Sequence, residues 1–170
     1  KNIGLLLDAY VRLPAPVRGR TQLVLAGSSG PPAAFWARAE ALQLRDRIEY
    51  VAGPTREALV RLYQGASVFA LPSDEEGLGM ALLEAMACGV PAVSTRSGGP
   101  DGVITDGKDG FLVPLDDAMQ LADRLDRLLQ NTELNAAMGR EARRAGPDGG
   151  EEREKSRIGL EQREELYARR

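Results

Sequence analysis

Two glutamates, Glu76 and Glu84, stand at either end of a glycine-bearing segment in the run EEGLGMALLEAMACGVP (75–91). Residues 80–88 are mostly Ala, Leu and Met, which predicts a helix over 78–88 that is apolar on nearly every side. Such a helix is normally buried, and a buried carboxylate is costly unless hydrogen-bond donors satisfy it. We therefore expect Glu84 to meet a donor, and the cis-diol of a ribose supplies two.

The start of this helix has the features of an anion site. Gly77 and Gly79 flank Leu78 there. The first four N–H groups of a helix have no partner within it, and the helix dipole adds about half a positive charge. Because glycines let an anion approach the backbone closely, the sequence predicts a phosphate site at the amides of residues 77–80.

The order of these groups along the helix suggests one ligand. Glu76 lies on the loop side, the amides follow, and Glu84 stands on the face of Gly77 about 10 Å further along the axis. A nucleotide sugar carries a hydroxyl-rich sugar, a diphosphate and a ribose diol in the same order. The combination predicts binding of a nucleotide diphosphate sugar.

Each feature taken alone has a simpler interpretation. Glu84 could be satisfied by an internal arginine or by loop N–H groups, and Glu76 could be a solvated loop acid. Gly98-Gly99 could be an ordinary turn. GSSG (27–30) follows a predicted strand but lacks the G-x-G-x-x-G spacing of dinucleotide-binding proteins, so a dehydrogenase is the weaker interpretation.

Composition excludes several classes of chemistry. The 170 residues include no histidine, which removes the usual zinc sites, Ser-His-Asp hydrolysis and histidine bases. A net charge of −3 gives no basic excess for nucleic acid, and no apolar run approaches the roughly 20 residues that cross a bilayer. Cys88 is the single cysteine, which favours a reducing compartment. We expect a cytoplasmic location, with peripheral attachment to a membrane through another domain left open.

Short strands of branched residues alternate with helices along the chain. The predicted strands are 21–26, 48–53, 67–72, 91–96 and 111–114, and the predicted helices are 3–13, 31–44, 56–66, 78–88, 117–129 and 133–145. This alternation predicts a doubly wound parallel sheet of the Rossmann-like α/β class. Since ligands bind beyond the carboxyl ends of such strands, the loops PSDEEGLG and SGGP should emerge at one edge of the sheet.

Two segments depart from this alternation. Residues 97–110 are rich in turn-forming types. From about residue 146 the composition shifts to Gly, Pro and charge. We expect a Rossmann-like domain over 1–145, followed over 146–170 by a charged linker and a terminal helix.

The run LPSDEEGLGMALLEAMACGVPAVSTRSGGPDGVITDGKDGFLVP (71–114) resembles a known family. It is similar to the C-terminal, donor-binding domain of retaining glycosyltransferases with the GT-B fold, family GT4 (group 1). That family carries a pattern close to P-S-x-x-E-G-F-G-x-x-x-x-E-A-M-A-x-G-x-P-V-I, and its paired glutamates correspond to Glu76 and Glu84. The similarity extends more loosely over 1–143.

The resemblance implies a role for each residue that matches the motif. Glu84 would bind the ribose of the nucleotide, and Glu76 the hydroxyls of the donor sugar. Lys1 falls at the position of a lysine near the diphosphate; taken alone, it is simply a charged first residue. Glu76 and Lys1 are thus the candidate catalytic residues. The backbone of Gly53 and Pro54 would contact the base of the nucleotide. The backbone amides of Gly77, Leu78, Gly79 and Met80 would hold the diphosphate.

Three departures from the family pattern stand out. The first strand of the domain and its arginine would lie before Lys1. Leu78 replaces the usual Phe, and Gly102 stands where many members have Glu. The acceptor site of such enzymes lies across a cleft on an N-terminal domain, so this chain would be about half of a longer enzyme.

The resemblance implies sugar transfer from a nucleotide diphosphate sugar with retention of configuration. No cofactor is expected, and the chain has no Asp-x-Asp pair, which agrees with a reaction that needs no metal. The partners would be the donor and the N-terminal acceptor domain. The alternative is a nucleotide-binding or interaction module without activity, and the isolated chain would be inactive in either case.

Overall fold

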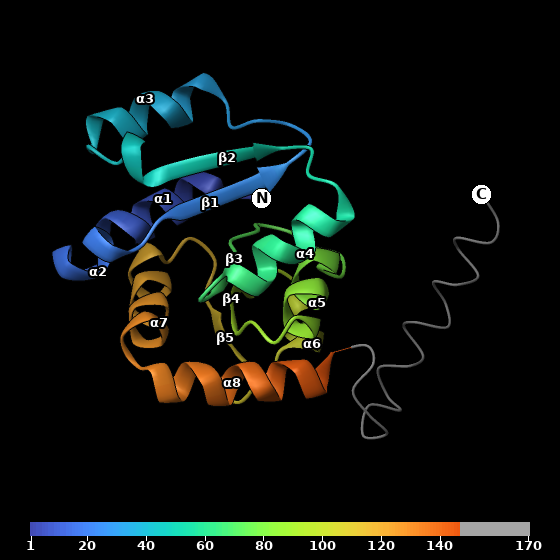
Figure 1. Cartoon of the computed structure of the whole chain (residues 1–170). Coiled ribbons are helices and arrows are strands. Elements are labelled where there is room, and N and C mark those ends of the chain that lie inside the picture. The colour runs from blue at the N-terminus through green and yellow to red at the C-terminus, as the bar shows by residue number, and fades with distance from the viewer. Residues whose placement is uncertain (147–170) are drawn as a thin grey trace.

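In the computed structural model, which describes residues 1–146, helices and parallel strands alternate along the chain (Figure 1). The strands are β1 (Leu23–Gly27), β2 (Ile48–Ala52), β3 (Phe69–Leu71), β4 (Ala92–Thr95) and β5 (Gly110–Val113). The helices are α1 (Ile3–Arg12), α2 (Ala15–Arg20), α3 (Ala33–Ala41), α4 (Arg56–Gly65), α5 (Met80–Ala87), α6 (Gly99–Val103), α7 (Ala118–Gln130) and α8 (Thr132–Ala145), with a short 3-10 helix η1 (Arg45–Arg47).

Side-chain caps fix where several of these helices begin. Thr55 accepts a hydrogen bond from the N–H of Ala58 at the start of α4. At the start of α7, Asp117 accepts a hydrogen bond from the N–H of Gln120. Gly89, with φ of 79°, follows the end of α5 in the left-handed conformation that glycine adopts readily.

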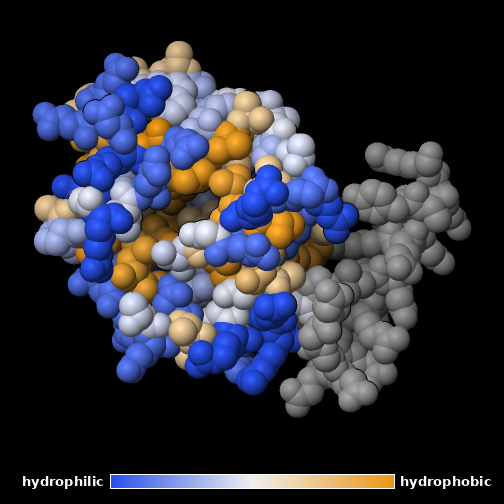
Figure 2. All heavy atoms as spheres, viewed as in Figure 1, coloured by the Kyte–Doolittle hydropathy of each residue, from blue (hydrophilic) through white to orange (hydrophobic). Residues whose placement is uncertain are grey.

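Every strand pair in the described part of the chain is parallel, and the strands form two groups: β1 pairs with β2, and β4 lies between β3 and β5. In the common doubly wound order 3-2-1-4-5-6, these groups take positions 3-2 and 4-5-6. Val24 on β1 is 41 % exposed. On the face of the molecule drawn in Figure 2, apolar residues surround a hollow between the β1–β2 pair and the β3–β4–β5 sheet.

One apolar core joins the two groups of strands. Helix α1 packs on α7, and Leu7 and Leu121 from these helices are fully buried beside Val93 of β4 and Val113 of β5. Leu23 and Leu25 of β1 pack against the same cluster. Burial of a leucine side chain contributes roughly 1.5–3 kcal/mol, so this core fixes the strands whose carboxyl ends form the site.

Three short elements were not predicted from the sequence: α2, η1 and α6. Helix α6 has the sequence GPDGV, whose glycines and proline are typical of turns, yet Asp101 satisfies the backbone N–H of Gly98 and starts a short helix. The predicted helix over 78–88 begins later, at Met80, because Gly79 adopts a left-handed conformation with φ of 80°.

The carboxyl-terminal expectations fall largely outside the described residues. Helix α8 ends at Ala145, and the predicted linker and terminal helix lie beyond residue 146, outside the part that the structure describes. Within residues 1–146 no helix has both the length and the apolar character that crossing a membrane requires.

The close approach of Gly139 on α8 to Gly89, just after α5, yields a prediction, with Gly19 on α2 as the control. A Cβ at Gly139 would overlap the carbonyl oxygen of Gly89, whereas a Cβ at Gly19 in α2 would meet nothing within 4 Å. Gly→Ala within a helix normally stabilises by roughly 0.5–1 kcal/mol. We expect Gly19→Ala to follow that rule and Gly139→Ala to lower the free energy of unfolding by about 1–3 kcal/mol. Urea unfolding measures both, and equal effects would show that the helices do not approach this closely.

Candidate functional site

Two loops meet at the carboxyl edge of the β3–β4–β5 sheet, as the sequence predicts. Residues 72–79 follow β3 and residues 96–98 follow β4. The N–H of Glu76 donates to the oxygen of Ser97 at 2.9 Å, and the N–H of Gly99 donates to the oxygen of Glu76 at 2.8 Å. A Cβ at Gly99 would overlap the carbonyl oxygen of Gly77. The Gly98-Gly99 pair therefore permits a close approach of two backbones and is more than a turn.

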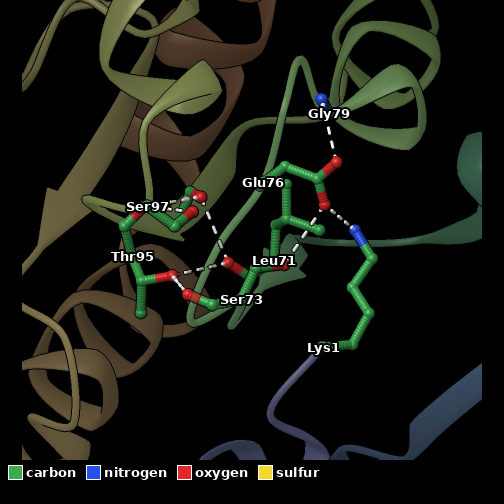
Figure 3. A network of polar contacts seen from close by, with 8 residues as sticks. Lys1, Leu71, Ser73, Glu76, Gly79, Thr95 and Ser97 are labelled. Atoms are coloured by element: carbon green, nitrogen blue, oxygen red, sulfur yellow. Dashed lines mark hydrogen bonds and ion pairs between the residues drawn. The ribbon is translucent and has the colours of Figure 1, made fainter.

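Buried hydroxyl groups hold the base of these loops (Figure 3). Ser73, Ser94 and Thr95 are at most 1 % exposed. Thr95 Oγ1 donates to the oxygen of Ser73 at 2.5 Å, and Ser94 Oγ donates to the oxygen of Leu71 at 3.1 Å. Each such bond contributes roughly 0.5–1.5 kcal/mol. They tie the loop after β3 to β4 and fix its backbone where the candidate residues begin.

Glu76 is the centre of the site. Its Oε2 accepts hydrogen bonds from Lys1 Nζ and from Ser73 Oγ at 3.2 Å, and its Oε1 accepts from the N–H of Gly79 at 3.2 Å (Figure 3). The Lys1 ammonium, with help from Ser73 and the Gly79 amide, lowers the pKa of Glu76 from its usual value despite partial burial. The structure thus brings together three of the predicted residues, Lys1, Glu76 and Gly79.

The amides at the start of α5 remain available to an anion. The N–H groups of Gly77, Leu78 and Met80 make no hydrogen bond within residues 1–146, and only that of Gly79 is taken, by Glu76. Leu78 is half-buried and packs against the cluster around Leu71 and Leu82, which anchors the loop. The carboxylate of Glu76 thus occupies part of the positive field that a phosphate would use.

The expected burial of Glu84 is wrong. Leu82, Ala85 and Met86 are buried, but Glu84 lies on an exposed side of α5. Its Oε2 accepts a hydrogen bond from the hydroxyl of Tyr63 at 3.1 Å, and it forms no ion pair with any of residues 1–146. An internal arginine therefore does not satisfy it. The shared helix face with Gly77 is also wrong, because α5 begins only at Met80.

Gly53 and Pro54 lie in the loop between β2 and α4. Gly53 has φ of 48°, is exposed, and donates its N–H to the oxygen of Gly27 at 2.8 Å. The loop leaves the carboxyl end of β2 and leads into α4, the helix that carries Tyr63. Within the described residues, neither Gly53 nor Pro54 forms a hydrogen bond with Glu76 or Glu84.

Three residues of the site were not identified from the sequence. Tyr63 belongs to no motif, and only the packing of α4 on α5 brings it to Glu84. Ser73 stands inside the loop motif PSDEEGLG but had no assigned role. Asn2 caps α1 through the N–H of Leu5 and also donates to Asp74 at 2.9 Å, which ties the start of the chain to the loop after β3.

Within residues 1–146 there is no group of three or more His, Cys, Asp or Glu side chains that could hold a metal ion. The charges gathered at the edge of the sheet are instead an ammonium, a carboxylate and the backbone amides at the start of a helix. Together these groups can bind a polar ligand that carries both hydroxyl groups and negative charge.

Over residues 1–145 the chain matches the family described as Glycosyl transferases group 1. It is 35 % identical over 137 residues to D-inositol 3-phosphate glycosyltransferase from Corynebacterium urealyticum, with 78 % of this chain and 31 % of the relative covered. It is 31 % identical over 143 residues to N-acetyl-alpha-D-glucosaminyl L-malate synthase from Bacillus anthracis, with 84 % of this chain and 36 % of the relative covered. The chain spans about a third of the length of these curated relatives.

Solved structures of glycosyltransferases share the fold. Sucrose-phosphate synthase from Thermosynechococcus elongatus matches with a TM-score of 0.78 and 28 % identity, covering 100 % of this chain and 43 % of that one. WaaG, a glycosyltransferase involved in lipopolysaccharide biosynthesis, matches with a TM-score of 0.76 and 28 % identity, covering 84 % of this chain and 38 % of that one. These likenesses confirm the expected Rossmann-like α/β fold of the C-terminal half of a GT-B protein.

The lowered pKa of Glu76 predicts a pH-dependent contribution to stability. Because the folded pKa lies below the usual 4.5, the ionised carboxylate stabilises the fold fully above pH 4.5, and this contribution is lost as the pH falls through the folded value. We expect Glu76→Gln to lower the free energy of unfolding by on the order of 1 kcal/mol at pH 7.

This difference should shrink as the pH falls below 4.5. Urea unfolding across this range measures it, with Glu75→Gln, an exposed neighbour, as the control. A difference that stays constant down to the lowest pH would contradict the ion pair.

Proposed function

This chain belongs to the group 1 glycosyl transferases, and we propose that it forms the donor-binding domain of a retaining glycosyltransferase that uses a nucleotide diphosphate sugar. The observation that carries the proposal is the cluster of Lys1, Glu76 and the Gly79 amide, beside further amides at the start of α5 that have no hydrogen-bond partner within residues 1–146. A lysine ammonium and N–H groups that have no partner among residues 1–146 suit a diphosphate, and a nearby carboxylate suits the hydroxyls of a sugar.

The diphosphate binds to the amides of residues 77–80 and to Lys1. A phosphate there competes with the Glu76 carboxylate for Lys1 and for the N–H of Gly79, since both anions need the same donors. Glu76 then accepts hydrogen bonds from the donor sugar instead. Ser73 Oγ, within 3.2 Å of Glu76, stays beside the carboxylate and limits how far it moves.

The nucleoside lies toward α4 and the second turn of α5. Glu84 offers an exposed carboxylate whose Oε1 has no hydrogen-bond partner within residues 1–146, and a ribose diol supplies donors to it. Gly53 and Pro54, in the loop that leads to α4, contact the base. The exposure of Glu84 supports this role, because a fully buried carboxylate could not reach a ligand.

In the reaction, the bond between the anomeric carbon and the phosphate oxygen breaks and the nucleoside diphosphate leaves. Its developing negative charge meets Lys1 and the α5 amides, which are fixed in place before the reaction and therefore reorganise little. Glu76 orients the sugar and is not the nucleophile. A hydroxyl oxygen of the acceptor, which another domain binds, forms the new bond to the anomeric carbon, and its proton passes to the leaving diphosphate. The configuration is retained, and neither a cofactor nor a metal ion takes part.

A second candidate is a nucleotide-binding module that has no activity of its own. The observation that favours it is that the groups gathered at the site, an ammonium, a carboxylate and backbone amides, are ones that bind a ligand. We propose that the isolated chain binds the donor without turnover and that a longer, cytoplasmic protein supplies the N-terminal acceptor domain. Activity of the isolated chain on any nucleotide sugar would contradict this division of labour.

Glu84→Gln tests the nucleoside site. A hydrogen bond to a charged acceptor contributes roughly 1.5–3 kcal/mol, so loss of the charge should weaken binding of UDP or GDP by about 10- to 100-fold. Isothermal titration measures this, and Glu133→Gln, an exposed glutamate on α8, is the control. Equal affinities of the wild type and Glu84→Gln would show that Glu84 does not bind the nucleotide.

Metal independence and retention are tested on the longer protein that contains this domain. We expect turnover of its nucleotide sugar to survive a chelator, because Lys1 and the amides stabilise the leaving group. Proton NMR of the first product should show the same anomeric configuration as the donor. Activity that disappears with the chelator and returns with a divalent cation would contradict the first expectation, and an inverted product the second.

A further inference from the structure

Tyr63 connects the hydrophobic core to the carboxylate of Glu84. Its side chain is 7 % exposed and packs with Ala85 and Val90 in a small buried cluster. The ring of Phe69 meets it edge-on, with ring centroids 5.7 Å apart and an angle of 79° between the ring planes. From this fixed position the hydroxyl donates to Glu84 Oε2 at 3.1 Å.

This contact restricts a side chain that would otherwise move freely. An exposed glutamate loses rotamer entropy when a ligand fixes it. The hydroxyl of Tyr63 is the only hydrogen-bond donor to Glu84 among the side chains of residues 1–146, and it engages Oε2 while leaving Oε1 open. Part of the ordering of Glu84 is therefore complete before a ligand arrives.

The hydroxyl of Tyr63 differs in its use from those of the other tyrosines in the described part of the chain. Tyr10 donates to the backbone oxygen of Thr21 at 2.9 Å, and Tyr50 donates to that of Gly27 at 2.7 Å. Tyr63 alone of the three donates to a carboxylate. Burial and the nearby Glu84 charge raise the pKa of Tyr63 well above its usual value, so the hydroxyl keeps its proton and remains a donor.

We propose that Tyr63 is a positioning residue that aims Glu84 at the ribose diol and so sets the preference of this domain for ribonucleotides over 2′-deoxyribonucleotides. The inference rests on the proposed function, in which Glu84 binds the ribose. An ionised carboxylate has about four lone-pair sites. With Tyr63 on one site of Oε2, the open Oε1 and the remaining site of Oε2 accept from the two ribose hydroxyls.

Removal of the Tyr63 hydroxyl loosens Glu84 without opening a cavity, because phenylalanine keeps the ring against Phe69. We expect Tyr63→Phe to weaken binding of UDP or GDP, whichever the wild type binds more tightly, by roughly 3- to 10-fold. The 2′-deoxy form of the same nucleotide offers Glu84 only its 3′-hydroxyl, so its affinity should fall by less and the preference for ribose should shrink. A role in packing alone would weaken both nucleotides equally.

The experiment measures both nucleotides by isothermal titration with the full 170-residue chain. The matched control is Tyr10→Phe on α1, which removes a hydroxyl that bonds to Thr21. This change should leave the preference for ribose over deoxyribose unchanged. In the background of Glu84→Gln, Tyr63→Phe should have little additional effect, because the two residues act through one carboxylate.

The outcomes separate the two proposals. If Glu84→Gln weakens the ribonucleotide but Tyr63→Phe leaves the ribose preference unchanged, the role of Tyr63 is wrong and the proposed function stands. An equal loss for both nucleotides in Tyr63→Phe also overturns it. If Glu84→Gln leaves affinity and preference unchanged, the ribose site itself is wrong and the inference falls with it.

Discussion

The site depends on a close contact between two backbones. The loop after β3 and the loop after β4 are joined by hydrogen bonds on both sides of Glu76, to Ser97 and from Gly99. No Cβ fits at Gly99, because it would overlap the carbonyl oxygen of Gly77. This contact sets the position of the Glu76 carboxylate and of the unpartnered amides that follow it, and the electrostatics of the site follow from that placement.

In the proposed donor complex, the donors that bond to Glu76 serve a second anion. Lys1 and the Gly79 amide stabilise the carboxylate of Glu76, which lowers its pKa. In the proposed complex they hold a diphosphate, and Glu76 turns to the sugar. The carboxylate of Glu76 thus compensates part of the positive charge at the start of α5.

Much of the fold and part of the site could be predicted from the sequence, because they depend on local patterns. Apolar periodicity located the strands, and the Gly-Leu-Gly segment indicated that a helix begins close to it. The meeting of the two glycine-bearing loops followed from the parallel arrangement alone. Lys1, Glu76 and Gly79 do come together.

What could not be predicted depends on packing between elements distant in sequence. Glu84 was expected to be buried because its neighbours along the chain are apolar, but α5 leaves one side open beside α4. Tyr63 lies 21 residues from Glu84 in the sequence, and only the packing of α4 on α5 brings its hydroxyl to the Glu84 carboxylate. Short helices such as α6 were missed because their Gly and Pro content is that of turns.

The most direct test of the proposed donor site is a crystal structure of the full chain with bound UDP or GDP. The proposal predicts the diphosphate against the amides of residues 77–80 and Lys1, with the ribose hydroxyls on Glu84. A nucleotide bound away from the start of α5, or one that leaves the Lys1–Glu76 pair and Glu84 untouched, would contradict it.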